Sequence, residues 1–469
     1  MSQERNETEI LKEQLFMNNR HTAKIVDGDE IDEAFSFCEG YKAFLDSCKT
    51  EREAAQFALK AAKDNGFTQF DKNKKYAPGD KVYYLNRKKA IILAVFGKKS
   101  VGEGVRIAAA HIDSPRLDLK PNPLYEDSEI ALFKTHYYGG IKKYQWTAIP
   151  LALHGVVIKK DGECVDITIG EKPDEPQFVI TDLLPHLAAS QMSRKAGEII
   201  KGEELNILVG SMPFKGDGES ELVKLNIMKI LNEKYGITER DFLTAELEAV
   251  PAAHVCDIGF DRSMIGGYGH DDRVCAYAEL KALFDLTVPE KTAVCILADK
   301  EEIGSTGATG MKSMAFELFL GDLCENKDGI LRHCMANSFC LSADVTNAFD
   351  PTYPEVSDRR NNAILNGGVA IAKYTGARGK SGCNDADAET MGKVRKAFHN
   401  GNVVWQTAEM GKVDQGGGGT VAAYMAERYI ETVDAGVPVI SMHAPYELVS
   451  KLDCYMTYLA CKAIYGLCD

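Results

Sequence analysis

The sequence predicts a protein of the α/β class, with a mainly parallel β-sheet and a separate β-rich region inserted between two parts of the sheet-forming chain. From residue 271 onward, short apolar runs alternate with helical patterns, as in a parallel sheet that helices cover on both faces. Between about Pro115 and Asp257, prolines and glycines interrupt the chain and paired strand-like runs replace that alternation. The length of 469 residues indicates at least two domains, because a single hydrophobic core stops growing well below this size.

The part of the chain before the insertion, residues 1–115, begins with helical patterns and continues with strands. Apolar residues spaced by three or four predict helices between about residues 8 and 66, one of them over residues 52–62. Three apolar runs then predict strands at residues 82–85, 90–95 and 105–109. The last of these strands leads directly to His111.

Residues 116–257 form the predicted inserted domain. Runs at residues 151–158 and 164–169, joined by Lys160-Asp161-Gly162, predict a β-hairpin. A helix is expected over residues 221–235 and a strand over residues 242–247. Residues 258–469 complete the first domain, with helices expected at 271–285, 311–319, 388–398, 420–430 and 445–465, and strands at 292–298, 339–343, 403–407 and 437–440.

Composition and charge limit the partners and the location of the protein. The formal net charge of −14, from 55 basic and 69 acidic residues, opposes binding to nucleic acid and to anionic membrane surfaces. No apolar stretch is long enough to span a bilayer, and the N-terminal residues are acidic rather than basic and apolar. The 13 cysteines show no Cys-x-x-Cys spacing, which favours a reducing compartment. We therefore expect a cytoplasmic protein.

Acids and histidines follow several predicted strands directly. In an open α/β sheet, ligands bind outside the carboxyl ends of the strands, so these side chains are expected to gather at one edge. Mixtures of histidine and carboxylate suit Zn²⁺, Mn²⁺ or Co²⁺. Two ions that share Asp271 would use four further ligands and leave Glu301 free. The candidates are His111, Asp113, Asp271, Glu301, Glu302, Asp344 and His443.

Local spacing suggests different tasks for the candidates that are neighbours in sequence. Asp113 lies two residues after His111 on an extended segment, so its carboxylate is expected to accept the second imidazole N–H and fix the tautomer. Glu301 and Glu302 point to different sides, so one can bind a metal while the other faces a water molecule. A metal-activated water and a carboxylate base predict hydrolysis.

Several longer segments resemble one known family. The run His111-Ile-Asp-Ser-Pro-Arg-Leu-Asp-Leu-Lys-Pro-Asn-Pro123, with Asp299-Lys-Glu-Glu-Ile-Gly-Ser305, Ser342-Ala-Asp344 and Gly436-Val-Pro-Val-Ile-Ser-Met-His443, resembles the M18 metallo-aminopeptidases, which include aspartyl aminopeptidase. The resemblance covers almost the whole chain in the family's motif order. It implies a zinc-exopeptidase-like α/β/α catalytic domain with a dimerisation domain inserted after the first histidine motif.

The resemblance also implies a role for each candidate. His111, Asp271, Glu302, Asp344 and His443 would be metal ligands, with Asp271 bridging two ions, His111 and Asp344 on one ion, and Glu302 and His443 on the other. Glu301 would be the general base. The implied activity is the release of N-terminal residues from peptide substrates by a dinuclear enzyme, most simply with zinc. The implied assembly is a homo-oligomer built from dimers, up to a dodecamer.

This chain also departs from the family's pattern. Asp272 follows Asp271 where the family usually has Asn, which makes Asp272 a competing bridging ligand. Lys300, Thr346-Asn347 and Asp350-Pro351 replace other common residues and leave the preferred substrate side chain open. A related dinuclear deacylase or carboxypeptidase is one alternative function. A non-catalytic scaffold protein is another, but no ligand or base is missing.

Four further features are candidates for the same site or its surroundings. The glycine-rich segment 412–420 is expected to lie close to the substrate; it lacks the Gly-Lys-Ser/Thr ending of a nucleotide-binding loop. Lys373, Arg378 and Lys380 are the candidates that would favour acidic substrates. His136, beside Tyr137-Tyr138-Gly139-Gly140, is a candidate to reach an active site across a subunit interface, and Glu447 is counted with Asp113 among the supporting carboxylates.

Overall fold

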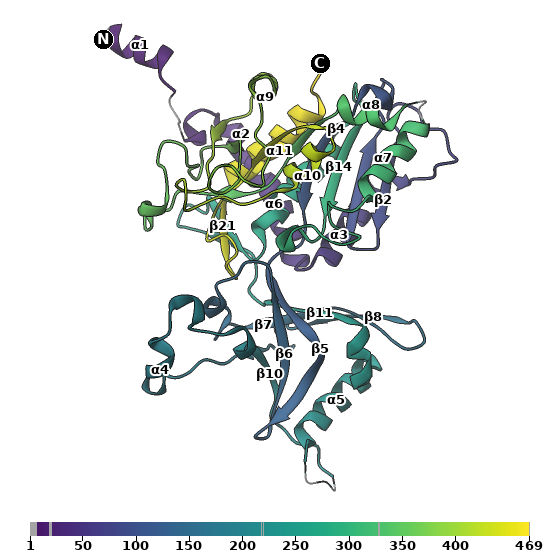
Figure 1. Ribbon diagram of the computed structural model, residues 1–469, viewed down its shortest axis with the longest axis vertical. Coiled ribbons are helices and arrows are strands. Elements are labelled where there is room, and N and C mark those ends of the chain that lie inside the picture. The colour runs from purple at the N-terminus through teal and green to yellow at the C-terminus, as the bar shows by residue number, and fades with distance from the viewer. Residues whose placement is uncertain (1–6, 18–20, 217, 219, 327–328, 469) are drawn as a thin grey trace.

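The protein consists of two bodies that are joined at a narrow junction. The computed structural model describes residues 7–17, 21–216, 218, 220–326 and 329–468. Figure 1 shows an upper body that contains both ends of the described chain and a lower body of antiparallel strands. We call the upper one the catalytic body, after the role that the resemblance implies for it, and the lower one the inserted body. Helix α1 (Glu7–Leu15) has no buried residue and stands away from the catalytic body.

A nine-stranded sheet forms the centre of the catalytic body. Its four central strands β14, β4, β15 and β19 run parallel, whereas β3 and β17 pair with them in the antiparallel direction. The predicted mainly parallel α/β architecture is therefore confirmed. In spatial order the strands are β1 (Thr68–Gln69), β2 (Lys81–Asn86), β3 (Ala90–Val95), β14 (Ala293–Ala298), β4 (Arg106–His111), β15 (Phe339–Ser342), β19 (Glu431–Gly436), β17 (Val369–Ala372) and β18 (Trp405–Thr407).

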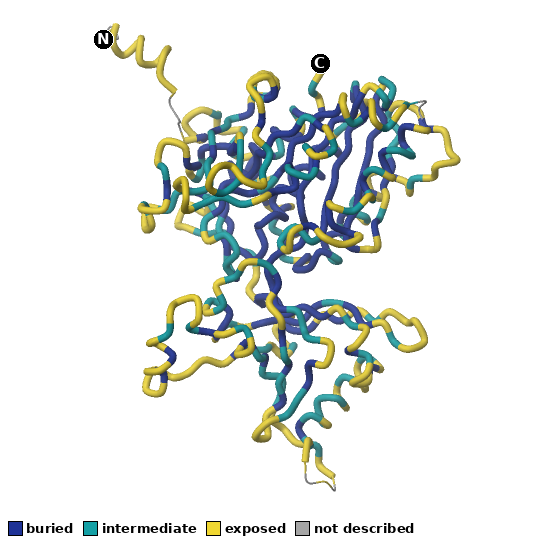
Figure 2. The backbone as a smooth tube through the Cα atoms, in the orientation of Figure 1, coloured by how far each residue is buried: buried dark blue, intermediate teal, exposed yellow. Residues whose placement is uncertain are grey.

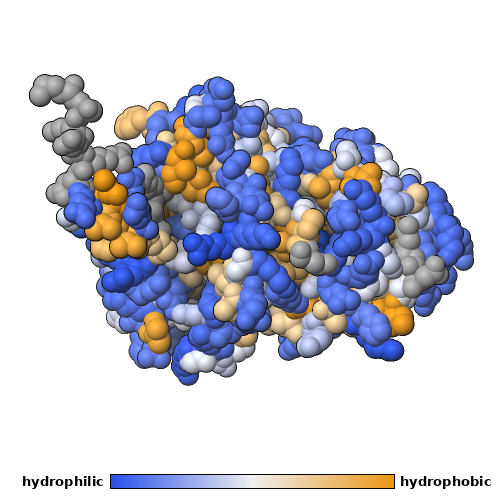
Figure 3. Space-filling view, turned by 90° about the horizontal axis from the view of Figure 1, so that it is seen from above, coloured by the Kyte–Doolittle hydropathy of each residue, from blue (hydrophilic) through white to orange (hydrophobic). Residues whose placement is uncertain are grey.

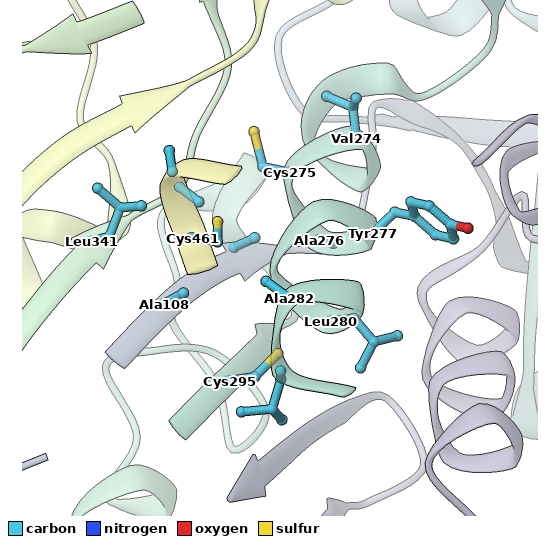
Figure 4. Packing of buried hydrophobic residues seen from close by; sticks show 14 of the residues in the cluster. Ala108, Val274, Cys275, Ala276, Tyr277, Leu280, Ala282, Cys295, Leu341 and Cys461 are labelled. Atoms are coloured by element: carbon cyan, nitrogen blue, oxygen red, sulfur yellow. The ribbon is translucent and has the colours of Figure 1, made fainter. Parts of the chain in front are cut away.

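Helices cover both faces of this sheet because its strands are apolar on both sides. In β4, Ala108 and Ala110 pack into one hydrophobic cluster, while Ile107 and Ala109 pack into the other. The first face carries α2 (Gly28–Ser47), α3 (Glu51–Asp64), α6 (His270–Phe284), α9 (Ala388–Asn400) and α11 (Lys451–Tyr465). The second face carries α7 (Ala315–Asn326), α8 (Leu331–Ala336) and α10 (Val421–Glu427). Figure 4 shows α6 packed by small side chains against β4 and α11, and the central strands are buried along their length in Figure 2.

The inserted body is an antiparallel sheet of seven strands with a core of its own. Its helices are the short α4 (Ala189–Met192) and α5 (Leu222–Tyr235). The predicted hairpin is present as β7 and β8. In spatial order the strands are β8 (Cys164–Ile169), β7 (Leu151–Ile158), β11 (Ala245–Pro251), β5 (Arg116–Asp127), β6 (Ile130–Tyr138), β10 (Asn206–Gly210) and β9 (Val179–Ile180). All of them lie within the range predicted for the insertion.

A third, five-stranded sheet completes the catalytic body. It contains β12 (Cys256–Ile258), β13 (Met264–Gly267), β21 (Glu447–Ser450), β20 (Pro438–Ile440) and β16 (Thr346–Asn347). The final helix was expected from residue 445, but residues 447–450 are strand β21, and Ser450 caps α11 by accepting the N–H groups of Leu452 and Asp453.

Several other boundaries differ from the sequence-based expectations. The strand expected at residues 437–440 is present as β20, but β19, which pairs with β15, was not predicted, because Asp434 and Gly436 give it a weak strand pattern. The strand expected at 242–247 begins at Ala245, after a 3₁₀ turn, and the helix expected at 311–319 begins at Ala315.

The face of the molecule that Figure 3 shows is largely hydrophilic, in agreement with the charged composition. In the view of Figure 3, hydrophobic side chains appear as separate patches between hydrophilic ones. Within the described part of the chain, no helix is both long and apolar enough to cross a membrane. Each of the 13 cysteines is a free thiol.

Candidate metal centre

The strand register brings the predicted ligands to one edge of the nine-stranded sheet. His111, the last residue of β4, pairs with Ala298 at the end of β14, so the turn with Glu301 and Glu302 begins beside it. Ser342 of β15 pairs with Ala109, which places Asp344 next to His111 on the other side. Parallel strands thus deliver these side chains from three neighbouring positions.

Two groups of potential ligands form at this edge, and they share one residue. The first contains His111, Asp271 and Asp344, and the second contains Asp271, Glu302 and His443. Within each group the ligand atoms lie within 4.8 Å of one another. The grouping is the same as the one that the family resemblance implies, with Asp271 shared between the two sets. Asp272, the competing candidate, belongs to neither group.

The carboxylate of Asp271 lies between the two histidines. Its Oδ1 is 3.1 Å from Nε2 of His111, and its Oδ2 is 3.1 Å from Nε2 of His443. Oδ1 of Asp271 and Oε1 of Glu302 are buried and make no hydrogen bond. Because buried polar atoms without partners are costly, these two atoms fit the site of a cation that would occupy the space in front of them.

Backbone carbonyl groups fix the tautomers of both histidines. Nδ1 of His111 is 2.9 Å from the carbonyl oxygen of Asp113, and Nδ1 of His443 is 2.9 Å from that of Gly140. A carbonyl oxygen only accepts, so Nδ1 donates its hydrogen in each ring and Nε2 keeps its lone pair for a metal. The expected partner of His111 was the Asp113 carboxylate, but its Oδ1 is 3.5 Å away, because the chain turns the backbone carbonyl toward the ring instead.

Two buried carboxylates hold the backbone of the ligand-bearing segments. Asp113 accepts the N–H of Glu301 at Oδ1, at 3.1 Å, and the N–H of Glu302 at Oδ2, at 3.2 Å. Glu447 accepts the N–H of His443 at 2.6 Å and the N–H of Asp271 at 3.1 Å. Each carboxylate therefore holds two backbone positions of the site. For Asp113 this differs from the expected contact of its carboxylate with the imidazole of His111.

The concentration of acids shifts the protonation of the site. Burial raises the pKa of Glu302 and Asp344 well above the usual range, and it raises the pKa of Glu301 to about 7. Burial also acts to raise the pKa of Asp271, but the facing imidazoles of His111 and His443 outweigh it and lower that pKa. The cluster thus holds more carboxylates than its two histidines can balance, as expected for residues that surround divalent cations.

A cleft of about 580 Å³ opens beside His443 at the junction of the two bodies. The inserted body contributes Gly140, Lys142 and Tyr144 to its wall, and the catalytic body contributes Asn347 and Asp350 among others. Two of the positions where this chain departs from the family's pattern therefore line the cleft next to the candidate metal centre.

Other predicted residues lie elsewhere or have other partners. Nζ of Lys373 and Nζ of Lys380 are 2.7 and 2.9 Å from the two carboxylate oxygens of Asp385. Lys380 and Gly417 line a separate hollow of about 250 Å³ that includes none of the five ligands. The ring of His136 is exposed, with Nδ1 2.8 Å from the carbonyl oxygen of Tyr137.

Sequence reasoning overlooked Tyr138 and Gly140, which contact Asp113 and His443. The available signal was the Gly139-Gly140 pair, which directly follows the aromatic end of a strand close to His136.

Comparison with known proteins identifies the family. The model of the family described as "Aminopeptidase I zinc metalloprotease (M18)" matches residues 44–465. The chain belongs to the M18 family. Because the matching family model describes a zinc metalloprotease and the relatives are M18 aminopeptidases, this M18 protein is a metal-dependent aminopeptidase, which is a peptide hydrolase. Its sequence is 51% identical to a probable M18 family aminopeptidase 1 of Clostridium acetobutylicum over 439 residues, which cover 92% of this chain and 94% of that protein.

Solved structures of relatives have the same fold as this M18 aminopeptidase. The crystal structure of the M18 aminopeptidase from Thermotoga maritima superposes with a TM-score of 0.92 at 44% identity, covering 96% of this chain and all of that chain. The crystal structure of aminopeptidase I from Clostridium acetobutylicum gives a TM-score of 0.90 at 47% identity, with 97% and 100% coverage. The predicted family and the predicted peptidase class are therefore confirmed.

Proposed function

We propose that this M18 aminopeptidase is a dinuclear enzyme in which Asp271 bridges two divalent ions. The observation that carries the proposal is the pair of ligand groups that share Asp271, with one carboxylate oxygen facing each histidine. His111 and Asp344 would complete one site, and Glu302 and His443 the other. The family makes zinc the first choice, although the same nitrogen and oxygen ligands suit manganese and cobalt. When bound, such ions polarise a carbonyl oxygen and lower the pKa of water.

Glu301 is proposed as the general base. It stands outside both ligand groups, whereas its neighbour Glu302 belongs to one of them, so its carboxylate is free for proton transfer. Glu301 accepts a proton from a water molecule as the water oxygen attacks the scissile carbonyl carbon. It then gives that proton to the peptide nitrogen as the C–N bond breaks. The products are one free amino acid and a peptide shortened by one residue.

The substrate residue is proposed to be neutral rather than acidic. A preference for Asp or Glu needs an available cation in the cleft, but Lys373 and Lys380 are already paired with Asp385. The third candidate, Arg378, lines the separate hollow and not the cleft beside His443. The cleft beside His443 also contains the carboxylates of Asp350 and Glu355 against the single cation of Lys142. Rates on aminoacyl substrates with Leu, Met, Lys, Asp and Glu test this point, and N-acylated substrates test the deacylase alternative.

Replacing Glu301 with Gln tests the mechanism directly. The variant should keep two bound ions, because Glu301 is not a ligand, while kcat falls by about a hundredfold or more through loss of the base. Metal analysis and steady-state kinetics on a Leu-peptide provide the two readouts. A near-normal kcat would refute the assignment of the base, and loss of an ion would make Glu301 a ligand instead.

The assembly and location are proposals as well. We infer a homo-oligomer in which the inserted body makes dimer contacts. One supporting observation is the common fold with the solved structure described as the mApe1 dodecamer of Saccharomyces cerevisiae, which is 19% identical with a TM-score of 0.73. A mass by light scattering well above 51.5 kDa is expected. The 13 free thiols support a cytoplasmic location.

A further inference from the structure

We propose that Tyr138 is a positioning residue, through which the inserted body sets the geometry of the turn that carries Glu301 and Glu302. The inference rests on the function proposed above for these two glutamates. Tyr138 is the last residue of β6, a strand that runs from the inserted body toward the junction in Figure 1. Its side chain nevertheless contacts a carboxylate at the metal centre.

The contact runs through Asp113. The hydroxyl of Tyr138 donates to Oδ2 of Asp113 at 2.8 Å, and the same oxygen accepts the N–H of Glu302. The other oxygen accepts the N–H of Glu301. Asp113 is completely buried, so these donors replace the water that would otherwise solvate its charge. Without the Tyr138 hydroxyl, the Asp113 carboxylate would lose a side-chain hydrogen-bond donor. The carboxylate would then be held by the two backbone N–H groups of the turn and would be fixed less firmly relative to the inserted body.

The ring of Tyr138 is itself fixed by an ion-pair network at the junction. The guanidinium carbon of Arg116 lies 3.9 Å from the centre of the ring. Arg116 pairs with Glu51 of α3 in the catalytic body, at 3.1 Å, and with Glu248 of β11 in the inserted body, at 3.2 Å. The position of the hydroxyl therefore depends on how the two bodies sit against each other.

The next two residues extend the contact to the second ligand group. Gly139 has a φ of +75°, and a Cβ there would lie 3.4 Å from Oε2 of Glu302. The carbonyl oxygen of Gly140 accepts the N–H at Nδ1 of His443. Tyr138 and Gly140 thus hydrogen-bond with Asp113 and His443, and Gly139 between them lies beside Glu302; these three partners come from three separate segments of the catalytic body. A shift of β6 would move the turn and the histidine together.

A matched pair of variants separates positioning from a purely structural role. Tyr138→Phe removes the hydroxyl that donates to Asp113. Tyr137→Phe removes the hydroxyl of the adjacent residue, which is 41% exposed and points to the opposite face of the strand. Both proteins are loaded with zinc for kinetics and with Co²⁺ for visible absorption spectra, because the d–d bands of Co²⁺ report the arrangement of its ligands.

Tyr138→Phe should lower kcat by about tenfold to a hundredfold with KM within about twofold, and it should shift the Co²⁺ bands. Tyr137→Phe should change neither. The proposal is overturned if Tyr138→Phe matches Tyr137→Phe in kcat and spectrum, or if it lowers only the melting temperature.

If Tyr138→Phe does not fold, Gly140→Ala tests the same segment, since its Cβ would lie 3.3 Å from Nδ1 of His443. An unchanged Co²⁺ spectrum in that variant overturns the proposal. A wild-type protein that cleaves no peptide, while Tyr138→Phe still shifts the Co²⁺ bands, would count against the proposed function and not against the positioning role.

Discussion

The two halves of the metal centre are built in different ways. His111 ends the central strand β4 and its side chain is 2% exposed, whereas His443 lies in the loop after β20 and is 35% exposed. His111 is oriented by the carbonyl of Asp113 in its own segment, but His443 is oriented by Gly140 of the inserted body. One half therefore depends on the central sheet, and the other depends on contact between the two bodies.

The largest effect is expected at Asp271, because it is the residue that the two halves share. Asp271→Asn removes the charge that faces both histidines, so bound metal should fall from two ions to fewer than one. Loss of both ions should reduce kcat by about a thousandfold or more. Metal analysis and kinetics of the purified variant check this result.

Asp272→Asn is the matched control for that variant. Asp272 is also buried, but it belongs to neither ligand group. If Asp272→Asn lost both ions while Asp271→Asn kept them, Asp272 would be the bridging ligand and the account of the two halves would be wrong.

A smaller effect should distinguish the halves from each other. Because His443 is more exposed and is held by a loop, the ion at Glu302 and His443 should leave first under a chelator, about tenfold faster than the other. Zinc release should therefore follow two phases in the wild-type protein. His443→Ala should remove the fast phase and keep one retained ion. A single phase of zinc release in the wild-type protein would contradict this difference between the two halves. So would a fast phase that is lost in His111→Ala and kept in His443→Ala.

The half of the centre that lies at the central sheet follows more directly from local sequence patterns than the half that depends on the inserted body. The apolar run before His111 indicates a buried strand, and a buried parallel strand places its next residue at the ligand-binding edge of the sheet. Glu447, one of the expected supporting carboxylates, accepts backbone N–H groups of the site, but its strand β21 lies where the sequence predicts the start of a helix. The contacts of Tyr138 and Gly140 could not be predicted, since they depend on how the two bodies meet rather than on any local pattern.

The smallest effect concerns the ion pairs between the bodies. Nδ1 of His154, on β7, is 2.8 Å from Glu53 of α3, and Nε2 is 2.8 Å from Glu171. Burial acts to lower the pKa of His154, but these two carboxylates raise it from 6.5 to about 9. A raised pKa means that protonated His154 contributes stability fully below pH 6.5 and loses that contribution as the pH rises through about 9.

His154→Gln should therefore be less stable than the wild type at pH 6 by about 1–3 kcal/mol, with the difference closing above pH 9. Urea unfolding at a series of pH values measures the difference. If the difference in the free energy of unfolding between the two proteins stays constant or increases from pH 6 to pH 10, His154 is not charged at the junction. His254→Gln is a suitable control, because His254 is exposed and pairs with Asp46 at the surface.

Anomalous diffraction at the zinc absorption edge, on crystals of the zinc-loaded protein, tests the shared-ligand centre most directly. The expected result is two zinc peaks, each about 2.0–2.2 Å from a different oxygen of Asp271, with His111 and Asp344 at one peak and Glu302 and His443 at the other. A single peak in fully loaded crystals, or two peaks bridged by Asp272, would contradict it.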